Sequence, residues 1–339
     1  MNRPACAVAL LLLSASMAHA QSRFMVERYT IGGEGGWDYL SVEPAGNRLF
    51  VSRGTHVQVF DLSQHKLIGD ITNTMGVHGI VVVPEFRRGF TTNGRDSTLT
   101  VFDATSLTPL SSIQIPSRNP DAILYEPHTK RIFAMNHTGQ SVTAVDAKTG
   151  AVIGTTPIGG VAEAAVSDEH HVYINIEDKG AIVKVDAKTL KLDATWPIAP
   201  CEEPTGLAFD EKHDRLFAAC GGNKMMAVVN SDNGKLITTV PIGAGSDGIV
   251  FDPETKLIYT SNGEGSVTVI HEDSPDKYSV VATIPTQRGA RTITLDPRTH
   301  TVYLSAALYG EAPAPTAAQP RPRPPIVPGS FMIVAIRRK

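Results

Sequence analysis

The stretch SDGIVFDPETKLIYTSNGEGSVTVI, residues 246–270, decides the fold of this chain. It consists of an apolar segment, a turn at Asp252 and Pro253, a second apolar segment, a small polar loop and a third segment with apolar residues at alternate positions. Proline fixes φ at the turn and aspartate bonds the neighbouring backbone, so the turn joins two strands. Alternation with a period of two is typical of strands. The stretch therefore predicts three consecutive strands, and it contains no catalytic motif.

The same pattern recurs along the chain, for example as PDAILYEPHTKRIFAMNHTGQSVTAV from residue 120. Its opening segments are WDYLSV at 37, VHGIVV at 77, PDAILY at 120, AEAAVS at 162, PTGLAF at 204, SDGIVF at 246 and ARTITL at 290. A repeat of about 42 residues with this strand content is typical of a β-propeller. The sequence therefore predicts an all-β fold, a seven-bladed β-propeller with four-stranded blades.

The two ends of the repeat region predict how the ring closes. The last repeat has no further strand after SFMIVAI, residues 330–336, and RFMVERYTI, residues 23–31, is a strand without a blade of its own. We expect the N-terminal strand to complete the seventh blade, because this pairing removes exposed strand edges. Residues 21–339 would then form a single propeller domain.

Residues 1–20 are predicted to be a signal peptide. Arg3 supplies the positive start, AVALLLL is a short apolar run, and AHA provides a small-x-small cleavage pattern. The apolar run is too short for an ordinary transmembrane helix, and no later stretch is apolar enough to span a membrane. We therefore expect a soluble monomer that is exported to a bacterial periplasm.

The charge balance argues against a nucleic-acid partner. The chain has 31 Lys and Arg, 34 Asp and Glu, and a formal net charge of −3 at pH 7, whereas nucleic-acid binding usually needs a concentrated basic face. The sequence also lacks a G-x-S-x-G elbow, a P-loop and a C-x-x-C pair. No local motif therefore identifies a reaction.

The repeat resembles that of the YVTN/YncE-like family of seven-bladed propellers from exported bacterial proteins. The resemblance rests on the pattern hhhDPxTxxhYhxNxxxxxVxVhDxxT (h, apolar), seen in IVFDPETKLIYTSNGEGSVTVI and ILYEPHTKRIFAMNHTGQSVTAVDAKTG, and on the ending PGSFMIVAIRRK after a proline-rich loop. It covers essentially the whole mature chain and implies the propeller fold. It implies no single function, because members of such folds serve as binding scaffolds, lyases, lactonases and cofactor enzymes.

The second residue of each opening segment is called its head residue. The seven head residues are expected to surround one mouth of the central channel, because the loops that enter each innermost strand emerge on one face. The predicted ligand-binding residues of this mouth are Asp38, His78, Asp121, Glu163, Thr205, Asp247 and Arg291. Arg291 comes between Asp247 and Asp38 once the ring closes, so an ion-pair cluster without further function is one interpretation. A binding site for a small molecule or a protein partner is the other.

Histidines among these carboxylates predict a site on blades 2 to 4. The candidate metal ligands are His78, Asp121, His137 and Glu163, and Glu177 lies in a neighbouring loop of blade 4. Imidazole and carboxylate groups suit zinc or another divalent transition metal. The same groups also suit acid–base chemistry without a metal. A divalent metal is the one cofactor that the sequence suggests.

Two cysteines and three asparagines carry structural predictions. Cys201 and Cys220 flank the first two strands of blade 5; an exported chain with two cysteines favours a disulfide, with buried free thiols or a copper or zinc pair as alternatives. Asn93, Asn136 and Asn262 recur at the end of the second strand. Asparagine stabilises turns there, and the alternative role for these amides is contact with a ligand.

The stretch YGEAPAPTAAQPRPRPPIVPGS, residues 309–330, is rich in proline and lies within the last blade. Proline favours extended, polyproline-like backbone. This loop is therefore either a flexible surface segment, or a lid or docking segment over the mouth.

These patterns favour a non-enzymatic binding or interaction protein, because no complete catalytic set is legible in the sequence. The alternative is a metal-assisted hydrolase, lactonase or lyase that uses His78, Asp121, His137 and Glu163. In that enzyme a bound metal would lower the pKa of its water and supply the nucleophile. The sequence names neither a substrate nor a partner.

Overall fold

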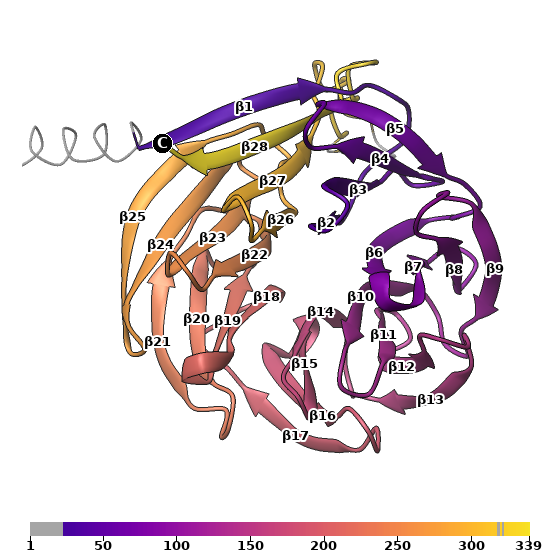
Figure 1. Ribbon diagram of the computed structural model, residues 1–339. Coiled ribbons are helices and arrows are strands. Elements are labelled where there is room, and N and C mark those ends of the chain that lie inside the picture. Colours follow the sequence, from indigo (N-terminus) through magenta and orange to yellow (C-terminus); the bar gives the residue numbers. More distant parts are fainter. Residues whose placement is uncertain (1–22, 317–318, 321) are drawn as a thin grey trace, which may run out of the picture.

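The computed structural model describes residues 23–316, 319–320 and 322–339. In this part of the chain, strands β1 to β28 form seven four-stranded sheets arranged in a ring around a central channel (Figure 1). The predicted all-β, seven-bladed propeller is confirmed. The predicted signal peptide, residues 1–20, lies outside the described residues.

Blades 1 to 6 are continuous stretches of chain whose strands follow one another from the channel to the rim. Blades 1 and 2 contain β2 (Leu40–Glu43), β3 (Arg48–Ser52), β4 (Val57–Asp61), β5 (Lys66–Ile71), β6 (Val77–Val83), β7 (Arg88–Asn93), β8 (Thr98–Asp103) and β9 (Pro109–Gln114). Blades 3 and 4 contain β10 (Pro120–Glu126), β11 (Arg131–Asn136), β12 (Ser141–Asp146), β13 (Val152–Pro157), β14 (Ala162–Ser167), β15 (His171–Ile176), β16 (Ala181–Asp186) and β17 (Leu192–Pro197).

Blades 5 and 6 repeat the same order. Their strands are β18 (Pro204–Asp210), β19 (Arg215–Cys220), β20 (Met225–Asn230), β21 (Leu236–Pro241), β22 (Ser246–Asp252), β23 (Leu257–Asn262), β24 (Ser266–Ser274) and β25 (Lys277–Pro285). Among the residues that the structure describes, three short 3₁₀ turns occur in the loops, namely η1 (Pro84–Phe86), η2 (Glu177–Lys179) and η3 (Glu211–His213).

Blade 7 joins the two ends of the described chain. Its strands are β26 (Ile293–Asp296), β27 (Thr301–Ala306), β28 (Met332–Arg338) and β1 (Phe24–Thr30). β1 pairs antiparallel with β28, and the register runs from Phe24 opposite Arg338 to Thr30 opposite Met332. The predicted closure of the last blade by the N-terminal strand is therefore confirmed.

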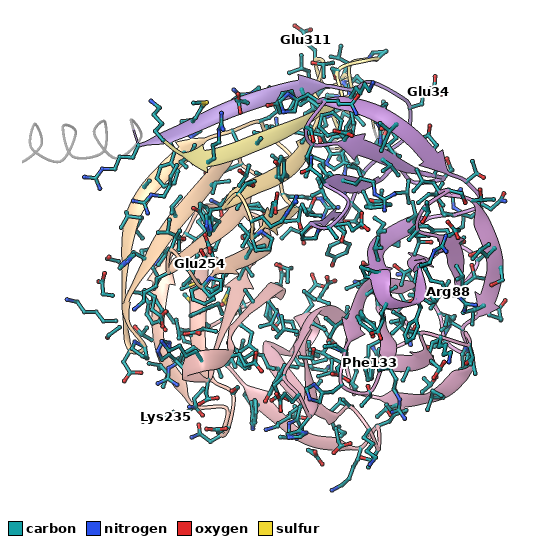
Figure 2. All side chains as sticks on the ribbon, viewed as in Figure 1. Glu34, Arg88, Phe133, Lys235, Glu254 and Glu311 are labelled. Atoms are coloured by element: carbon teal, nitrogen blue, oxygen red, sulfur yellow. A yellow bond between two sulfur atoms is a disulfide. The ribbon has the colours of Figure 1, made fainter. Side chains whose placement is uncertain are left out.

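The hydrophobic core lies between neighbouring blades. Side chains fill these spaces around the ring, and Phe133 is one of them (Figure 2). Phe133 in blade 3, for example, belongs to one buried cluster with Val172 and Val183 of blade 4. Each blade thus buries both faces. A one-residue slip of a strand would move every one of its side chains into the wrong cluster between blades, so the register is fixed.

Close approach of the innermost strands requires glycine. A Cβ on Gly206 would lie 2.9 Å from backbone atoms of Gly248 in the next blade, and a Cβ on Gly248 would lie 3.0 Å from the backbone N of Ile293. Small residues after the head position therefore keep the ring tight. Within the described residues, no helix has the length and apolar character needed to cross a membrane.

Candidate functional site

The mouth residues of blades 6, 7 and 1 form an ion-pair cluster. Arg291 donates a hydrogen bond to Asp247, and its Nη2 lies 3.4 Å from Oδ1 of Asp38. Asp247 is the second residue of β22, whereas Asp38 and Arg291 precede β2 and β26. Three head residues from separate blades therefore meet as the order of the repeats around the ring suggested.

His78 joins blades 1, 2 and 3. Its Nδ1 donates a 2.6 Å hydrogen bond to Oδ2 of Asp38 and lies 3.6 Å from Oδ2 of Asp121. Gly94 leaves room for the ring, since a Cβ there would lie 2.8 Å from Nε2. Burial alone would lower the pKa of His78, but the hydrogen bond to Asp38 and the charges of Asp121 and Asp38 outweigh burial and raise it. The pair of acids thus favours the protonated imidazole.

His137 makes a separate cluster on blades 3 and 4. Its Nε2 lies 3.1 Å from Oε1 of Glu163 and 3.7 Å from Oε2 of Glu177. The hydrogen bond to Glu163 raises the pKa of His137 to about 8, against the opposing effect of burial. Burial and the charge of Glu163 raise the pKa of Glu177. Glu177 reaches the cluster because η2 follows β15 directly.

The residues predicted as metal ligands therefore fall into two groups. The ligand atoms lie within 4.8 Å of one another in each of the groups Asp38, His78, Asp121 and His137, Glu163, Glu177. Each group places one imidazole between two carboxylates. The structure thus adds Asp38 to the residues that contact His78, whereas the sequence placed Asp38 with Arg291 alone.

Two mouth acids are partly buried and hold their protons more tightly than usual. Burial raises the pKa of Asp121 to about 7, although the charge of His78 opposes the shift. Burial likewise raises the pKa of Asp247 to about 6, against the effect of Arg291. Desolvation disfavours the charged form of a carboxyl group, and nearby acids add to this effect. The mouth therefore changes its charge close to neutral pH.

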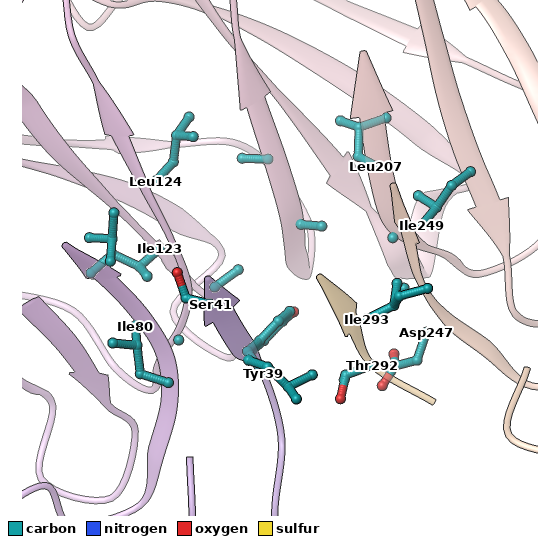
Figure 3. Close-up of a pocket in the computed structure, with 18 of the residues that line it drawn as sticks. Tyr39, Ser41, Ile80, Ile123, Leu124, Leu207, Asp247, Ile249, Thr292 and Ile293 are labelled. Carbon is teal, nitrogen blue, oxygen red and sulfur yellow. The ribbon is translucent and has the colours of Figure 1, made fainter. Parts of the chain in front are cut away.

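Tyr39 lies inside the channel next to the acidic mouth. Its ring projects into the channel (Figure 3) and packs against the core cluster of blades 3 and 4, although it comes from blade 1. The equivalent residues of the other blades are Gly79, Ala122, Ala164, Gly206, Gly248 and Thr292. Burial and the charges of the four acidic mouth residues raise the pKa of Tyr39 well above its usual value.

The channel wall beside Tyr39 is mostly apolar. A cavity of about 420 Å³ lies along the innermost strands, and Ile80, Ile123, Leu207 and Ile249 are among the side chains that face it (Figure 3). Sequence reasoning missed Tyr39, yet a signal was present. In the aligned repeats it is the single large residue at a position otherwise filled by small ones.

The part of the mouth formed by blades 7 and 1 is aromatic and basic. A cavity of about 490 Å³ is lined by Trp37, Arg288, Tyr309 and Arg323, together with Arg291. The rings of Trp37 and Tyr309 have centroids 6.3 Å apart. Arg288 and Arg323 are exposed, and neither has a carboxylate within ion-pair distance in the part of the chain that the structure describes. This cavity was not anticipated from the sequence.

A buried arginine fixes the glycine-rich segment 32–36 that leads to Trp37. Arg53 is 1% exposed, and its terminal nitrogens donate hydrogen bonds of 2.8 to 3.3 Å to backbone carbonyls of this segment. Its guanidinium lies 3.6 Å from the ring centroid of Phe331. Burial lowers the pKa of Arg53 to about 10, so it remains charged at neutral pH.

The proline-rich loop is tied at its base. The backbone N of Gly310 donates to the carbonyl of Pro325 at 2.8 Å, and the N of Val327 donates to the carbonyl of Leu308 at 2.9 Å. Tyr309 and Ile326 pair as an isolated bridge. Because Tyr309, Arg323 and Ile326 also line the basic cavity, the described ends of the loop form one of its walls.

Several of the predicted residues are structural. Thr205 is buried, and its Oγ1 donates to the carbonyl of Ser246 in the next blade at 2.8 Å. The buried amide of Asn136 donates to the hydroxyls of Ser141 and Thr143 at 3.1 and 2.9 Å. Asn262 makes the equivalent bonds to Ser266 and Thr268, and Asn93 contacts Thr98 and Thr100. These amides therefore hold the loop after the second strand.

Cys201 and Cys220 are joined by a disulfide in the structure, with their Cα atoms 5.3 Å apart. Both residues are buried in the cluster that packs blade 4 against blade 5. The bond joins the loop before β18 to the end of β19. It therefore fixes the entry to blade 5 beside the mouth.

Comparisons with known proteins identify the fold but no narrower group. No protein-family model and no curated protein matches the chain. Among solved structures, the chain is similar to one titled Kuenenia stuttgartiensis Hydrazine Synthase, with a TM-score of 0.68, 15% sequence identity, and coverage of 81% of this chain and 93% of that chain. At this identity the similarity shows the propeller fold alone. Membership of the YVTN/YncE-like family stays a prediction.

Proposed function

We propose that this protein is a binding propeller whose mouth holds a small molecule with a cationic group at one end and an anionic group at the other. The observation that carries the proposal is the separation of charge across one mouth. Acids and imidazoles lie on blades 1 to 4, and arginines lie beside two aromatic rings on blades 7 and 1. We further propose that residues 1–20 direct the protein to the periplasm, where such a ligand would be met.

The acidic side supports binding of a cation. Asp121 and Glu163 are 14% and 13% exposed, and their neighbours are histidines that can release a proton. Like charges gathered in a cleft of low dielectric focus a negative potential, which favours a positively charged guest. When the imidazole is neutral, an ammonium group can donate to the same carboxylates in its place. A divalent metal can instead be bound by the imidazole and the carboxylates together.

The basic side supports binding of an anion. Arg288 and Arg323 lack carboxylate partners among the described residues, so their donors are available for a carboxylate or a phosphate. Trp37 and Tyr309 supply apolar surface next to them. Arg291, which is paired with Asp247 and Asp38, separates the two sides.

Calorimetric titration with linear ω-amino acids tests the proposal. The probes are glycine, 4-aminobutyrate, 6-aminohexanoate and 8-aminooctanoate, each compared with the amine and the carboxylate of equal length. We expect one length to bind best and to bind more tightly than either single-charged analogue. Glu163→Gln should weaken the amine series, and an Arg288→Ala/Arg323→Ala variant should weaken the carboxylate series.

Two exposed residues on the opposite face provide matched controls. Lys148→Ala and Glu169→Gln remove one charge of each sign there, and neither should change binding. Chain length should matter because the two charged sides are fixed by different blades. Affinities that are equal for all lengths, or that respond equally to the mouth variants and to the controls, would contradict the proposal.

A further inference from the structure

One buried acid occupies a position where the fold needs no charge. In each of blades 1 to 6, the third strand pairs antiparallel with the second. At the face opposite the mouth, the first residue after the paired part of the third strand donates its N–H to the carbonyl of the residue that precedes the second strand. In blades 1 to 5 these residues are Leu62, Ala104, Ala147, Ala187 and Ser231. In blade 6 the residue is Glu272, which donates to Lys256 at 2.9 Å. A carboxylate here is therefore not required by the propeller.

The carboxylate of Glu272 is buried, and no N–H or hydroxyl donor satisfies it among the described residues. The residue is 1% exposed, and no N–H or hydroxyl group of the described residues donates to either carboxyl oxygen. Its ionisable neighbours are the carboxyl group of Asp210 and Nδ1 of His213, which lies 3.6 Å from Oε1. Burial of an uncompensated carboxylate is strongly unfavourable, so the group needs a proton or a cation.

A second buried acid points to the same place. Asp210 ends β18 and is 3% exposed, and its Oδ2 lies 2.5 Å from Nδ1 of His213 in η3. The corresponding acid Asp252 accepts a hydrogen bond from the backbone N of Glu254 in its own turn. Asp210 makes no such bond to η3. Its carboxylate is therefore directed at His213 and Glu272, instead of stabilising the turn.

Neighbouring cations do not neutralise the two acids. Arg215 donates to the carbonyl oxygens of Pro275 and His213 and pairs with Asp276. Lys256 makes no ion pair with the cluster among the residues that the structure describes. His213 is the one basic side chain that contacts both acids in this part of the chain.

We propose that Asp210, His213 and Glu272 bind a divalent transition metal that links blade 5 to blade 6. Nδ1 of His213 lies 2.5 Å from Oδ2 of Asp210 and 3.6 Å from Oε1 of Glu272, and one ligand atom from each residue lies within 4.8 Å of the other two. A single ion with ligands at about 2.0–2.2 Å can therefore contact all three after small side-chain movements. One imidazole and two carboxylates suit zinc or manganese. Calcium prefers six to eight oxygen ligands, which this set does not supply.

The site lies away from the mouth and has its own access to solvent. Strand β18 runs from the mouth at Pro204 to the opposite face at Asp210. The side chain of His213 is 24% exposed, whereas those of Asp210 and Glu272 are 4% and 1% exposed. A metal can therefore enter beside the imidazole and keep a water ligand on that side. The proposal does not depend on the function proposed for the mouth.

Zinc titration of chelator-treated protein tests the site. The measurement uses a His78→Gln/His137→Gln background, so that the mouth imidazoles do not contribute. Calorimetry should show one zinc ion per chain, manganese should compete, and calcium should not. In this background Glu272→Ala should weaken zinc binding at least about 100-fold, because it removes a direct ligand and not an outer partner. Zinc should also raise the melting temperature of the background protein and leave that of the Glu272→Ala variant unchanged.

The repeat itself supplies the controls. Alanine occupies the equivalent position in blades 2, 3 and 4, so Glu272→Ala should fold and, without metal, melt no lower than its parent. Ser231→Ala at the equivalent position of blade 5 should leave zinc binding intact. His213→Gln provides a second test at a partly exposed residue and should also abolish binding. A background protein that takes up no zinc, or a Glu272→Ala variant that binds it unchanged, overturns the proposal and leaves a pair of acids that share a proton.

Discussion

The carboxylate of Asp38 accepts a 2.6 Å hydrogen bond from Nδ1 of His78, although the two residues lie 40 positions apart in different blades. The other oxygen of Asp38 faces Arg291 at 3.4 Å. One acid therefore connects the basic and the acidic sides of the mouth. A substitution of Asp38 should therefore shift the pKa of His78 more than the pKa of His137.

The first prediction concerns this connection. Asp38→Asn removes a negative charge and a hydrogen-bond acceptor of the protonated imidazole, so the pKa of His78 should fall. The pKa of His137 should move much less, because Glu163 is its main partner. NMR titration of the imidazole Cε1 protons measures both values. Equal shifts of the two histidines, or none for His78, would show that Asp38 does not hold the proton.

The second prediction locates a metal or organic cation at the mouth. Asp121→Asn and Glu163→Gln should each weaken binding of zinc, because each removes an acid next to an imidazole. Asp247→Asn should matter less, since Arg291 already occupies that acid. Calorimetric titration with zinc, copper, manganese and calcium compares the three variants in a Glu272→Ala background. An equal loss in all three would remove the claim that the cation lies on blades 2 to 4.

The third prediction concerns pH and stability in metal-free protein. The pKa of His137 is raised to about 8 in the folded state from an ordinary value of 6.5, so the folded state binds the proton more tightly than the unfolded state. The resulting stabilisation is complete below about pH 6.5 and disappears as the pH rises through 8. The loss should be roughly 1 kcal/mol for this partly exposed pair.

Urea unfolding of the parent and of His137→Gln at pH 6, 7, 8 and 9 checks this effect. Both proteins contain the other titrating mouth groups, so the difference between their free energies of unfolding isolates His137. That difference should shrink as the pH rises. A difference that grows with pH would have the wrong sign for a raised pKa.

The fourth prediction concerns the disulfide. Cys201 and Cys220 are separated by 19 positions, and closing a loop of this size stabilises a protein by about 3 kcal/mol in the chain-entropy model. Cys201→Ala/Cys220→Ala should therefore lower the free energy of unfolding by about this amount, measured in urea. Reductant should lower the stability of the parent and leave the double variant unchanged. Thiols that alkylate in the native, unreduced parent would disprove the bond.

The fifth prediction concerns ring closure. Deletion of residues 21–31 removes β1 and exposes the edge of β28, so the protein should aggregate or lose much of its stability. Transfer of residues 24–31 to a position after Lys339, through a short turn, should restore folding. The transfer is feasible because the backbone N of Lys339 already donates to the carbonyl of Arg23 at 2.9 Å. Light scattering and thermal unfolding compare the deletion variant with the variant that carries the moved strand. A deletion variant that stays monomeric and melts like the parent argues against closure.

The fold was predictable because every blade repeats one local pattern. Turn residues such as Pro253 and the alternating apolar positions of Val267 and Val269 describe strands without reference to the rest of the chain. The missing strand of the last blade was equally visible, because an unpaired edge is unfavourable in any propeller. These features depend on local turn and strand preferences, and each of the seven repeats contains them.

The site was predictable only in part because side-chain reach is not encoded in the repeat. The head positions placed His78 and Asp121 at the mouth, but the contact between His78 and Asp38 depends on how far each side chain extends across a blade boundary. Tyr39 crosses the channel for the same reason. Glu272 was overlooked because the repeats were compared at their heads, whereas its signal lies at the opposite corner, where Ala187 is its counterpart.

The pairing of β1 with β28 also determines when blade 7 can be completed during synthesis. Thr30 meets Met332, so the first strand leaves the ribosome about 300 residues before its partner, and at 5–20 residues per second this interval lasts roughly 15 to 60 s. During that time the other blades can assemble in order while β1 has nothing to pair with. β1 is therefore the last strand of the propeller to be placed, and the nascent chain carries an unsatisfied edge until β28 has been made.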